Sequence, residues 1–355
     1  MPRKNHQAIA LWLFLCCGLV FAMVVLGGVT RLTESGLSIT DWRPVTGILP
    51  PMSEEGWQNE FNKYIDSPEF IKRNYHFTLI HFKGIFWLEY LHRLLGRLVG
   101  FAFLIPMLVF WLRGDFTRRF ALKMGGVFLL GGLQGLIGWL MVKSGLVDQP
   151  YVSPYRLALH LSVALLIYSL MFWQGLRVYA FGRNSTNTLN NGNNKIINSN
   201  IPIYVILILA VQILLGAFIA GMDGGLVYNT YPKMNGQWIP EGIWAIQLGW
   251  RNLFENIALV QFLHRTNAVV FIGLVLWGWW QTRQVPRHPV HYAFKTLLIL
   301  SISQFLLGIF TLISHVPVVL GALHQAMAVL LLTFSLFIAV QTYGNVPKTD
   351  ALPRM

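Results

Sequence analysis

Residues 86–112 read FWLEYLHRLLGRLVGFAFLIPMLVFWL, a stretch long and apolar enough to cross a bilayer, since a helix needs about 20 residues to span the hydrocarbon core. Seven more stretches of this kind occur, at 9–29, 120–142, 156–179, 201–221, 258–281, 293–314 and 317–341. Across the 355 residues, 55% are hydrophobic and only 12% are charged. The sequence therefore predicts an all-α polytopic membrane protein with eight transmembrane helices.

The distribution of charge predicts the orientation in the membrane, because Lys and Arg are retained on the cytoplasmic side. With the N-terminus inside, nearly all of the net charge of +13 falls on the inner segments, so both termini are expected to be cytoplasmic. The excess of basic residues is therefore explained by the orientation in the membrane, and no nucleic-acid partner is expected. The first span follows MPRKNHQ directly, without a long Arg- and Ser-rich presequence, which favours a bacterial inner membrane.

The chain divides into two similar halves. Residues 182–200, GRNSTNTLNNGNNKIINSN, are polar and predict a cytoplasmic linker between an N-terminal half, 1–181, and a C-terminal half, 201–355. Four pairs of segments match in order: 26–50 with 215–240, EYLHR (89–93) with QFLHR (261–265), 157–166 with 321–330, and, more weakly, 134–146 with 304–316. Because four spans is an even number, both halves enter from the same side. We expect two pseudo-symmetric four-helix bundles related by an axis normal to the membrane.

The largest outer segment, 30–85, is predicted to carry a short helix on the bilayer surface. Ser53 can cap its start, and one face is apolar, with Trp57, Phe61, Tyr64 and Ile65.

Each half carries two histidines at equivalent places, one to two turns inside the outer ends of even-numbered spans: His92, His160, His264 and His324. A single intramembrane histidine is equally well explained as a packed core residue, but matched pairs favour a function. Zinc would need a third or fourth ligand, and neither half offers a cysteine or a second carboxylate at that depth. Haem iron takes one or two axial imidazoles. The sequence therefore predicts one haem site in each half.

Room for a flat ring is indicated one turn beyond each histidine, where the residues are all small: Gly96, Ala164, Ala268 and Ala328. Close helix packing is the other explanation for small residues at these positions. The remaining histidines fall in termini, loops or helix edges and are interpreted as ordinary interfacial residues: His6, His76, His81, His288, His291 and His315.

Charged residues beside the histidines indicate further roles. Arg93, Arg97 and Arg265 are predicted to pair with haem propionates, with snorkelling to the interface as the alternative. Glu89 lies three residues before His92 on the same face, whereas its counterpart in the second half is Gln261. A carboxylate can stabilise positive charge, orient water or move a proton, and an amide can only hydrogen-bond. The first half is therefore predicted to be reactive, with Glu89 as the catalytic residue; a structural role beside Arg93 or a ligand imidazole is the alternative.

These features together resemble the haem A synthase family. The resemblance lies in eight spans in two repeats, E-x-x-H-R opening the second span, single histidines opening spans four, six and eight, and GGVTRLTESGLSITDW after the first span, which resembles the proteobacterial and mitochondrial form. The outer-loop cysteine pair of some branches is missing. The two cysteines, Cys16 and Cys17, lie inside the first span and are interpreted as packing residues.

The resemblance implies oxidation of the C8 methyl group of haem O to a formyl group, giving haem A for cytochrome c oxidase. It implies that His92 and His160 hold haem O, and that His264 and His324 hold a resident haem b that passes electrons. Glu89 would stabilise a developing carbocation or position a water molecule, and the new oxygen would come from water. Expected partners are haem O synthase, cytochrome c oxidase assembly factors and membrane lipid, and a homo-oligomer is possible.

Two other classes of protein share part of this pattern. A di-haem cytochrome b that carries electrons to or from quinone would use the same four histidines, but it has no need for the difference between Glu89 and Gln261. A transporter built from repeats would use helices broken near the midplane, and the spans lack paired central breaks.

Overall fold

The computed structural model describes residues 2–41, 46–147, 150–184 and 200–343. Eight of its helices are long and apolar enough to cross a membrane. They are α1 (Pro2–Leu32), α3 (Leu79–Leu112), α4 (Arg118–Gly145), α5 (Pro154–Asn184), α6 (Ile201–Gly221), α8 (Ile257–Gln281), α9 (Pro289–Ile313) and α10 (Val318–Tyr343). These helices cover the eight predicted spans, and the described residues contain no β-strand. The predicted class, an all-α polytopic membrane protein, is confirmed.

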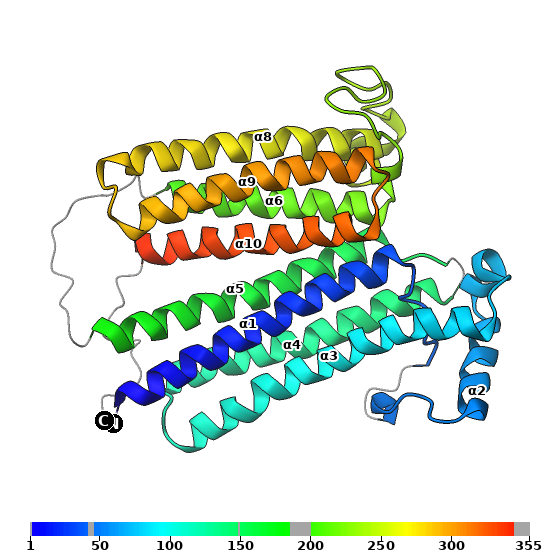
Figure 1. Cartoon of the computed structure of the whole chain (residues 1–355), viewed down its shortest axis with the longest axis horizontal. Coiled ribbons are helices and arrows are strands. Elements are labelled where there is room, and N and C mark those ends of the chain that lie inside the picture. The colour runs from blue at the N-terminus through cyan, green and yellow to red at the C-terminus, as the bar shows by residue number, and fades with distance from the viewer. Residues whose placement is uncertain (1, 42–45, 148–149, 185–199, 344–355) are drawn as a thin grey trace.

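Shorter elements occupy the connections: η1 (Thr46–Ile48), α2 (Glu54–Ile65), η2 (Phe70–Asn74), η3 (Gly224–Leu226), η4 (Ile246–Arg251), α7 (Asn252–Glu255) and η5 (Thr282–Gln284). The start of α1 and the end of α10 lie at one end of the helix array, and α2 lies at the other (Figure 1). Of the predicted linker 182–200, residues 185–199 lie outside the described residues.

The two sets of four helices make the same contacts. In the first half α1 packs on α3 and α5, and α4 packs on α3 and α5; in the second half α6 packs on α8 and α10, and α9 packs on α8 and α10. The halves meet through α1 with α10, α5 with α6, and α5 with α10. Figure 1 shows the same division, with α1 and α5 facing α10 across the middle of the array. This pattern is the one expected of two repeats related by a two-fold axis.

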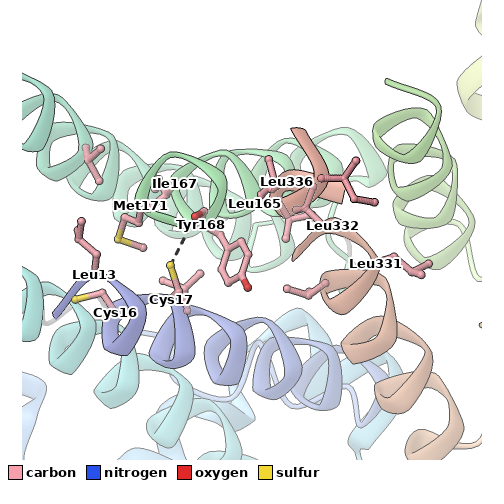
Figure 2. Packing of buried hydrophobic residues seen from close by; sticks show 14 of the residues in the cluster. Leu13, Cys16, Cys17, Leu165, Ile167, Tyr168, Met171, Leu331, Leu332 and Leu336 are labelled. Atoms are coloured by element: carbon pink, nitrogen blue, oxygen red, sulfur yellow. Dashed lines mark hydrogen bonds between the residues drawn. The ribbon is translucent and has the colours of Figure 1, made fainter. Parts of the chain in front are cut away.

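The centre of the molecule is a packed apolar cluster between α1, α5 and α10 (Figure 2). Both cysteines are buried and free. The Sγ of Cys17 donates to the carbonyl oxygen of Tyr168 at 3.8 Å, and the hydroxyl of Tyr168 is 2.6 Å from that of Thr333 in the second half. The cysteines are therefore packing residues, as the sequence indicated.

The outer segment departs from its prediction in one respect. Ser53 does cap α2, since its Oγ accepts a hydrogen bond from the Gly56 N–H at 3.1 Å. However, the apolar face of α2 does not lie on a bilayer surface, because it is buried in a cluster with aromatic residues of α3. That cluster exists because α3 begins at Leu79, several residues before the predicted span, and so supplies Phe82 at the outer end.

Candidate functional site

The four histidines lie on α3, α5, α8 and α10, and each side chain is partly buried. His92 and His160 are close enough for their imidazoles to interact electrostatically, and so are His264 and His324. These are the pairs that the internal repeat predicts, one in each half.

Each imidazole rests against a glycine of the neighbouring helix. A methyl group added at Gly138 would lie 2.8 Å from Cε1 of His160, and one added at Gly308 would lie 2.9 Å from Cε1 of His324. The same test gives 3.1 Å at Gly216 for Cε1 of His264, and 3.0 Å at Gly27 for Nε2 of His92. Any larger residue at these four positions would therefore push the ring away.

Three of these glycines are preceded, one turn earlier, by a glutamine that contacts the same histidine. Nε2 of Gln134 donates to the carbonyl oxygen of His160 at 2.9 Å, Nε2 of Gln212 to that of His264 at 3.1 Å, and Nε2 of Gln304 to that of His324 at 3.0 Å. The same amide nitrogens lie 3.3, 3.3 and 3.4 Å from the ring Nε2 atoms. The sequence analysis missed these residues, although Q-x-x-x-G occurs in both segments of the weakest repeat match.

The paired imidazoles fit a haem iron. Buried Nδ1 atoms of His160, His264 and His324 have no hydrogen-bond partner. A buried polar atom without a partner is costly, which favours a bound group at this place. No group of three or more His, Cys, Asp or Glu side chains able to hold a metal ion occurs in the described part of the chain. Two imidazoles alone suit a haem iron, whereas zinc needs more ligands.

Glu89 is buried on α3 and has all its acceptor positions engaged. Its Oε2 accepts from the hydroxyl of Ser38 at 2.7 Å and from the N–H of Ile39 at 2.8 Å. Its Oε1 accepts from Nη2 of Arg93 at 2.6 Å and from Nε at 3.1 Å. The ion pair with Arg93, which the sequence left as an alternative role, is therefore present, and the carboxylate also fixes the chain that follows α1.

The two arginines next to the histidines hold equivalent pieces of chain. Arg93 donates to the carbonyl oxygens of Ile39 at 2.9 Å and Asp41 at 3.3 Å. Arg265 donates to those of Tyr228 at 2.8 Å and Thr230 at 2.9 Å, which occupy the same places in the matched segments 26–50 and 215–240. Arg97 lies one turn beyond Arg93 and is partly buried. The pairing of these arginines with haem propionates stays a prediction.

The two halves differ chemically at the polar residue that lies four positions before each arginine. Nε2 of Gln261 donates to the carbonyl oxygen of Tyr228 at 3.4 Å, whereas Glu89 accepts from the N–H of the equivalent Ile39. An amide thus replaces the carboxylate in the second half. Two of the other histidines have structural roles at the starts of helices: His81 accepts from the N–H of Thr78 at the start of α3, and His288 accepts from that of Val290 at the start of α9.

The fold and the site define an eight-helix membrane protein with two similar halves, each holding a pair of imidazoles near one end of the helices. A family model described as Cytochrome oxidase assembly protein matches residues 10–336, and the chain belongs to this family. It is 46% identical over 345 residues to Heme A synthase of Nitrosospira multiformis, covering 95% of this chain and 96% of the relative. Heme A synthase of Parvibaculum lavamentivorans is 43% identical over 324 residues, covering 91% and 90%. Heme A synthase COX15 of Arabidopsis thaliana is 44% identical over 350 residues, covering 94% of this chain and 74% of the relative. The resemblance found in the sequence is confirmed.

Proposed function

We infer that this protein is a haem A synthase, an enzyme that oxidises haem O to haem A for cytochrome c oxidase. The observation that carries the inference is similarity along nearly the whole chain to relatives named for this activity. The two histidine pairs support it, because the reaction needs a site for a substrate haem and a route for electrons. A di-haem electron carrier linked to quinone is not favoured, because the relatives carry the name of the synthase.

We assign His92 and His160 to the substrate haem O, and His264 and His324 to a resident haem b. The haem b would supply electron transfer when bound. Glu89 supports this assignment of the halves, because its carboxylate lies on the same helix face as His92 and the second half has Gln261 in its place. Arg93, Arg97 and Arg265 lie close to the ligands and are assigned to the propionates.

The chemistry proposed at the C8 methyl group consists of two successive two-electron oxidations. The first, with one water, gives a hydroxymethyl group; the second, with another water, gives a gem-diol that loses water to leave the formyl group. In net terms, the methyl group and one water yield the formyl group, four protons and four electrons, and the electrons would leave through the haem b of the second half to an electron acceptor outside the protein. Positive charge that develops at the methyl carbon would be stabilised by the fixed carboxylate of Glu89, which Ser38, Ile39 and Arg93 hold in place.

The reaction and the eight apolar helices also suggest the setting. We place the protein in the bacterial inner membrane, where haem O synthase would supply the substrate and assembly factors of cytochrome c oxidase would receive the product. A homo-oligomer is compatible with this arrangement.

The decisive experiment identifies the haems extracted from the purified protein and from Glu89→Gln. Glutamine keeps the shape of the side chain and accepts from Ser38 and Ile39, but it removes the negative charge beside Arg93. We expect the variant to keep both haems, to accumulate haem O and to form no haem A. Ser38→Ala is the matched comparison, because it removes one of the hydrogen bonds that hold Glu89 and keeps the carboxylate, so it should form haem A at a reduced rate. A normal haem A yield from Glu89→Gln would remove this residue from the mechanism.

The assignment of the halves has its own test. His264→Ala and His324→Ala should each lose haem b, since a single remaining imidazole holds the iron weakly. Haem b at full occupancy in either variant would overturn the assignment.

A further inference from the structure

The four imidazoles are not held in the same way. His160, His264 and His324 each have a glutamine whose amide donates to the histidine carbonyl and touches the ring. His92 has Met23 at the equivalent position, four residues before Gly27 on α1. The terminal methyl of Met23 would lie 3.3 Å from a methyl group added at Gly96, so this side chain reaches past His92 to the next turn of α3. A thioether has no hydrogen to donate, and it cannot orient a carbonyl or a ring nitrogen as an amide does.

The surroundings of His92 and His264 also differ at a second position. Oε1 of Gln212 accepts from Nδ2 of Asn267 at 2.8 Å, and the same Nδ2 donates to the carbonyl oxygen of Ile208 at 3.2 Å. The position equivalent to Asn267 in the first half is Leu95, three residues after His92 as Asn267 is three residues after His264. His264 is thus held by a glutamine that is itself fixed, whereas the equivalent positions of the first half carry an unbranched thioether and a leucine.

The contact with a glycine is common to the four rings, so the distinction between them rests on the glutamines. At Gly138, Gly216 and Gly308 the atom nearest to an added methyl group is Cε1 of the histidine. At Gly27 it is Nε2 of His92. A half-turn of an imidazole about its Cβ–Cγ bond exchanges Cε1 with Nε2, so all four rings meet their glycines by the same edge.

A substrate site and a cofactor site need different ligands. A resident haem must stay, and two oriented ligands keep it by lowering the ordering cost of binding. A substrate haem must enter, and its product must leave, which requires that the bonds from both histidines to the iron break. One oriented and one unconstrained histidine suit that site.

We propose that Gln134, Gln212 and Gln304 are positioning residues that fix three of the ligand imidazoles, and that His92, which lacks such a partner, is the exchangeable ligand through which the substrate haem is admitted and the product haem released. This inference rests on the proposed function, because it takes the four histidines as haem ligands. It predicts that the protein releases haem O and haem A from the first half much faster than haem b from the second.

The first measurement needs no variant. Purified holoprotein is mixed with excess apomyoglobin, and the haems that transfer are identified by chromatography over time. We expect haem O and haem A to leave at least tenfold faster than haem b. Equal rates would overturn the inference. If His92→Ala and His264→Ala both kept all of their haem, the proposed function would be overturned instead. The two failures are therefore distinguishable.

The second measurement exchanges the surroundings of the two histidines. Met23→Gln with Leu95→Asn gives His92 the partners of His264, and should slow the transfer of haem O and haem A about tenfold. Gln212→Met with Asn267→Leu does the reverse, and should speed the transfer of haem b by a similar factor. Carbon monoxide binding to the reduced protein is the second readout. The first exchange should decrease carbon monoxide binding and the second should increase it. A general loosening of the fold would not produce changes in both directions. Rates and carbon monoxide binding unchanged within twofold in both exchanges would overturn the inference.

Discussion

At the scale of single residues, the site depends on backbone positions that tolerate no side chain. Gly138 carries the ring of His160, whereas Gly135, less than one turn earlier on α4, has nothing within 4 Å of an added methyl group. The two glycines therefore allow the ring contact to be separated from any general effect of alanine on the helix.

Gly138→Ala should weaken haem binding in the first half about fivefold, because forcing a ring off its rotamer costs on the order of 1 kcal/mol and about 1.4 kcal/mol is a factor of ten. Gly135→Ala should bind haem normally, since alanine is the better helix former. Haem content per polypeptide, measured by absorbance across a haem titration, checks both. Equal affinities in the two variants would contradict the role given to Gly138.

The histidines could be predicted from the sequence, but their glutamine partners could not. His92 and His264 stand in nearly identical pentapeptides, so the repeat identified them directly. Gln134 and Gln304 lie in the weakest of the matched segments, and a glutamine in a membrane helix reveals its partner only when the facing helix is known. The role of Met23 was hidden for the same reason, since methionine in an apolar span is unremarkable by itself.

A buried carboxyl outside the membrane gives a pH dependence. Burial raises the pKa of Glu69 to about 7, although the hydroxyl of Tyr64 donates to it at 2.9 Å and Arg73 lies nearby. In the unfolded chain the carboxyl titrates near its usual 4.5. The folded state therefore binds more protons between these values, and the stability of the outer segment falls as pH rises from about 4.5 to about 7.

Glu69→Gln should flatten this dependence, because an amide does not titrate. The unfolding temperature, followed by tryptophan fluorescence from Trp57 and its neighbours, should drop between pH 5 and pH 8 in the wild type and drop less in the variant. A parallel decrease in both proteins would show that another group is responsible.

At the scale of elements, the positions of the spans were predictable and the outer ends were not. Apolar length alone located all eight helices. It did not show that α3 continues outward from 86 to Leu79, because HFKG (81–84) is not apolar enough to read as part of a span. This extension is what turns α2 from a surface helix into one packed on protein, since it brings Phe82 against Phe61 and Tyr64.

Phe82→Ala should therefore loosen the outer segment. The side chain is fully buried, and removal of a buried phenylalanine costs about 3 to 5 kcal/mol. Limited proteolysis should cut the segment containing α2 at least tenfold faster than in the wild type, while the spans remain protected. Ile80→Ala is the control on the same turn, since Ile80 is 81% exposed, and it should leave the cleavage rate unchanged. Equal cleavage in both variants would contradict the packing role of Phe82.

At the scale of the whole molecule, the repeat explains how two histidine pairs can have different surroundings within one architecture. The helices that meet at the centre, α1 and α5 with α6 and α10, are equivalent members of the two halves. Polar contacts join them as well: Arg31 of α1 pairs with Asp223 at 2.6 Å and donates to the carbonyl oxygen of Ala220, and Gln325 of α10 donates to that of Val24 at 2.8 Å. The sequence predicted the duplication from matched segments, but which helices form the central contact is a property of three-dimensional packing.

The two halves approach each other closely at Gly221, where an added methyl group would be 2.7 Å from Cα of Pro154. A backbone atom cannot turn aside as a side chain can, so Gly221→Ala should force α6 away from the start of α5. The halves 1–184 and 200–355, produced together as separate chains, should assemble and co-purify, because the contacts between α1, α5, α6 and α10 do not depend on a covalent connection. Gly221→Ala should reduce the recovery of the N-terminal half on a tagged C-terminal half several-fold, whereas Gly273→Ala, with nothing within 4 Å, should not. Equal recovery with the two variants would show that the halves are held together elsewhere.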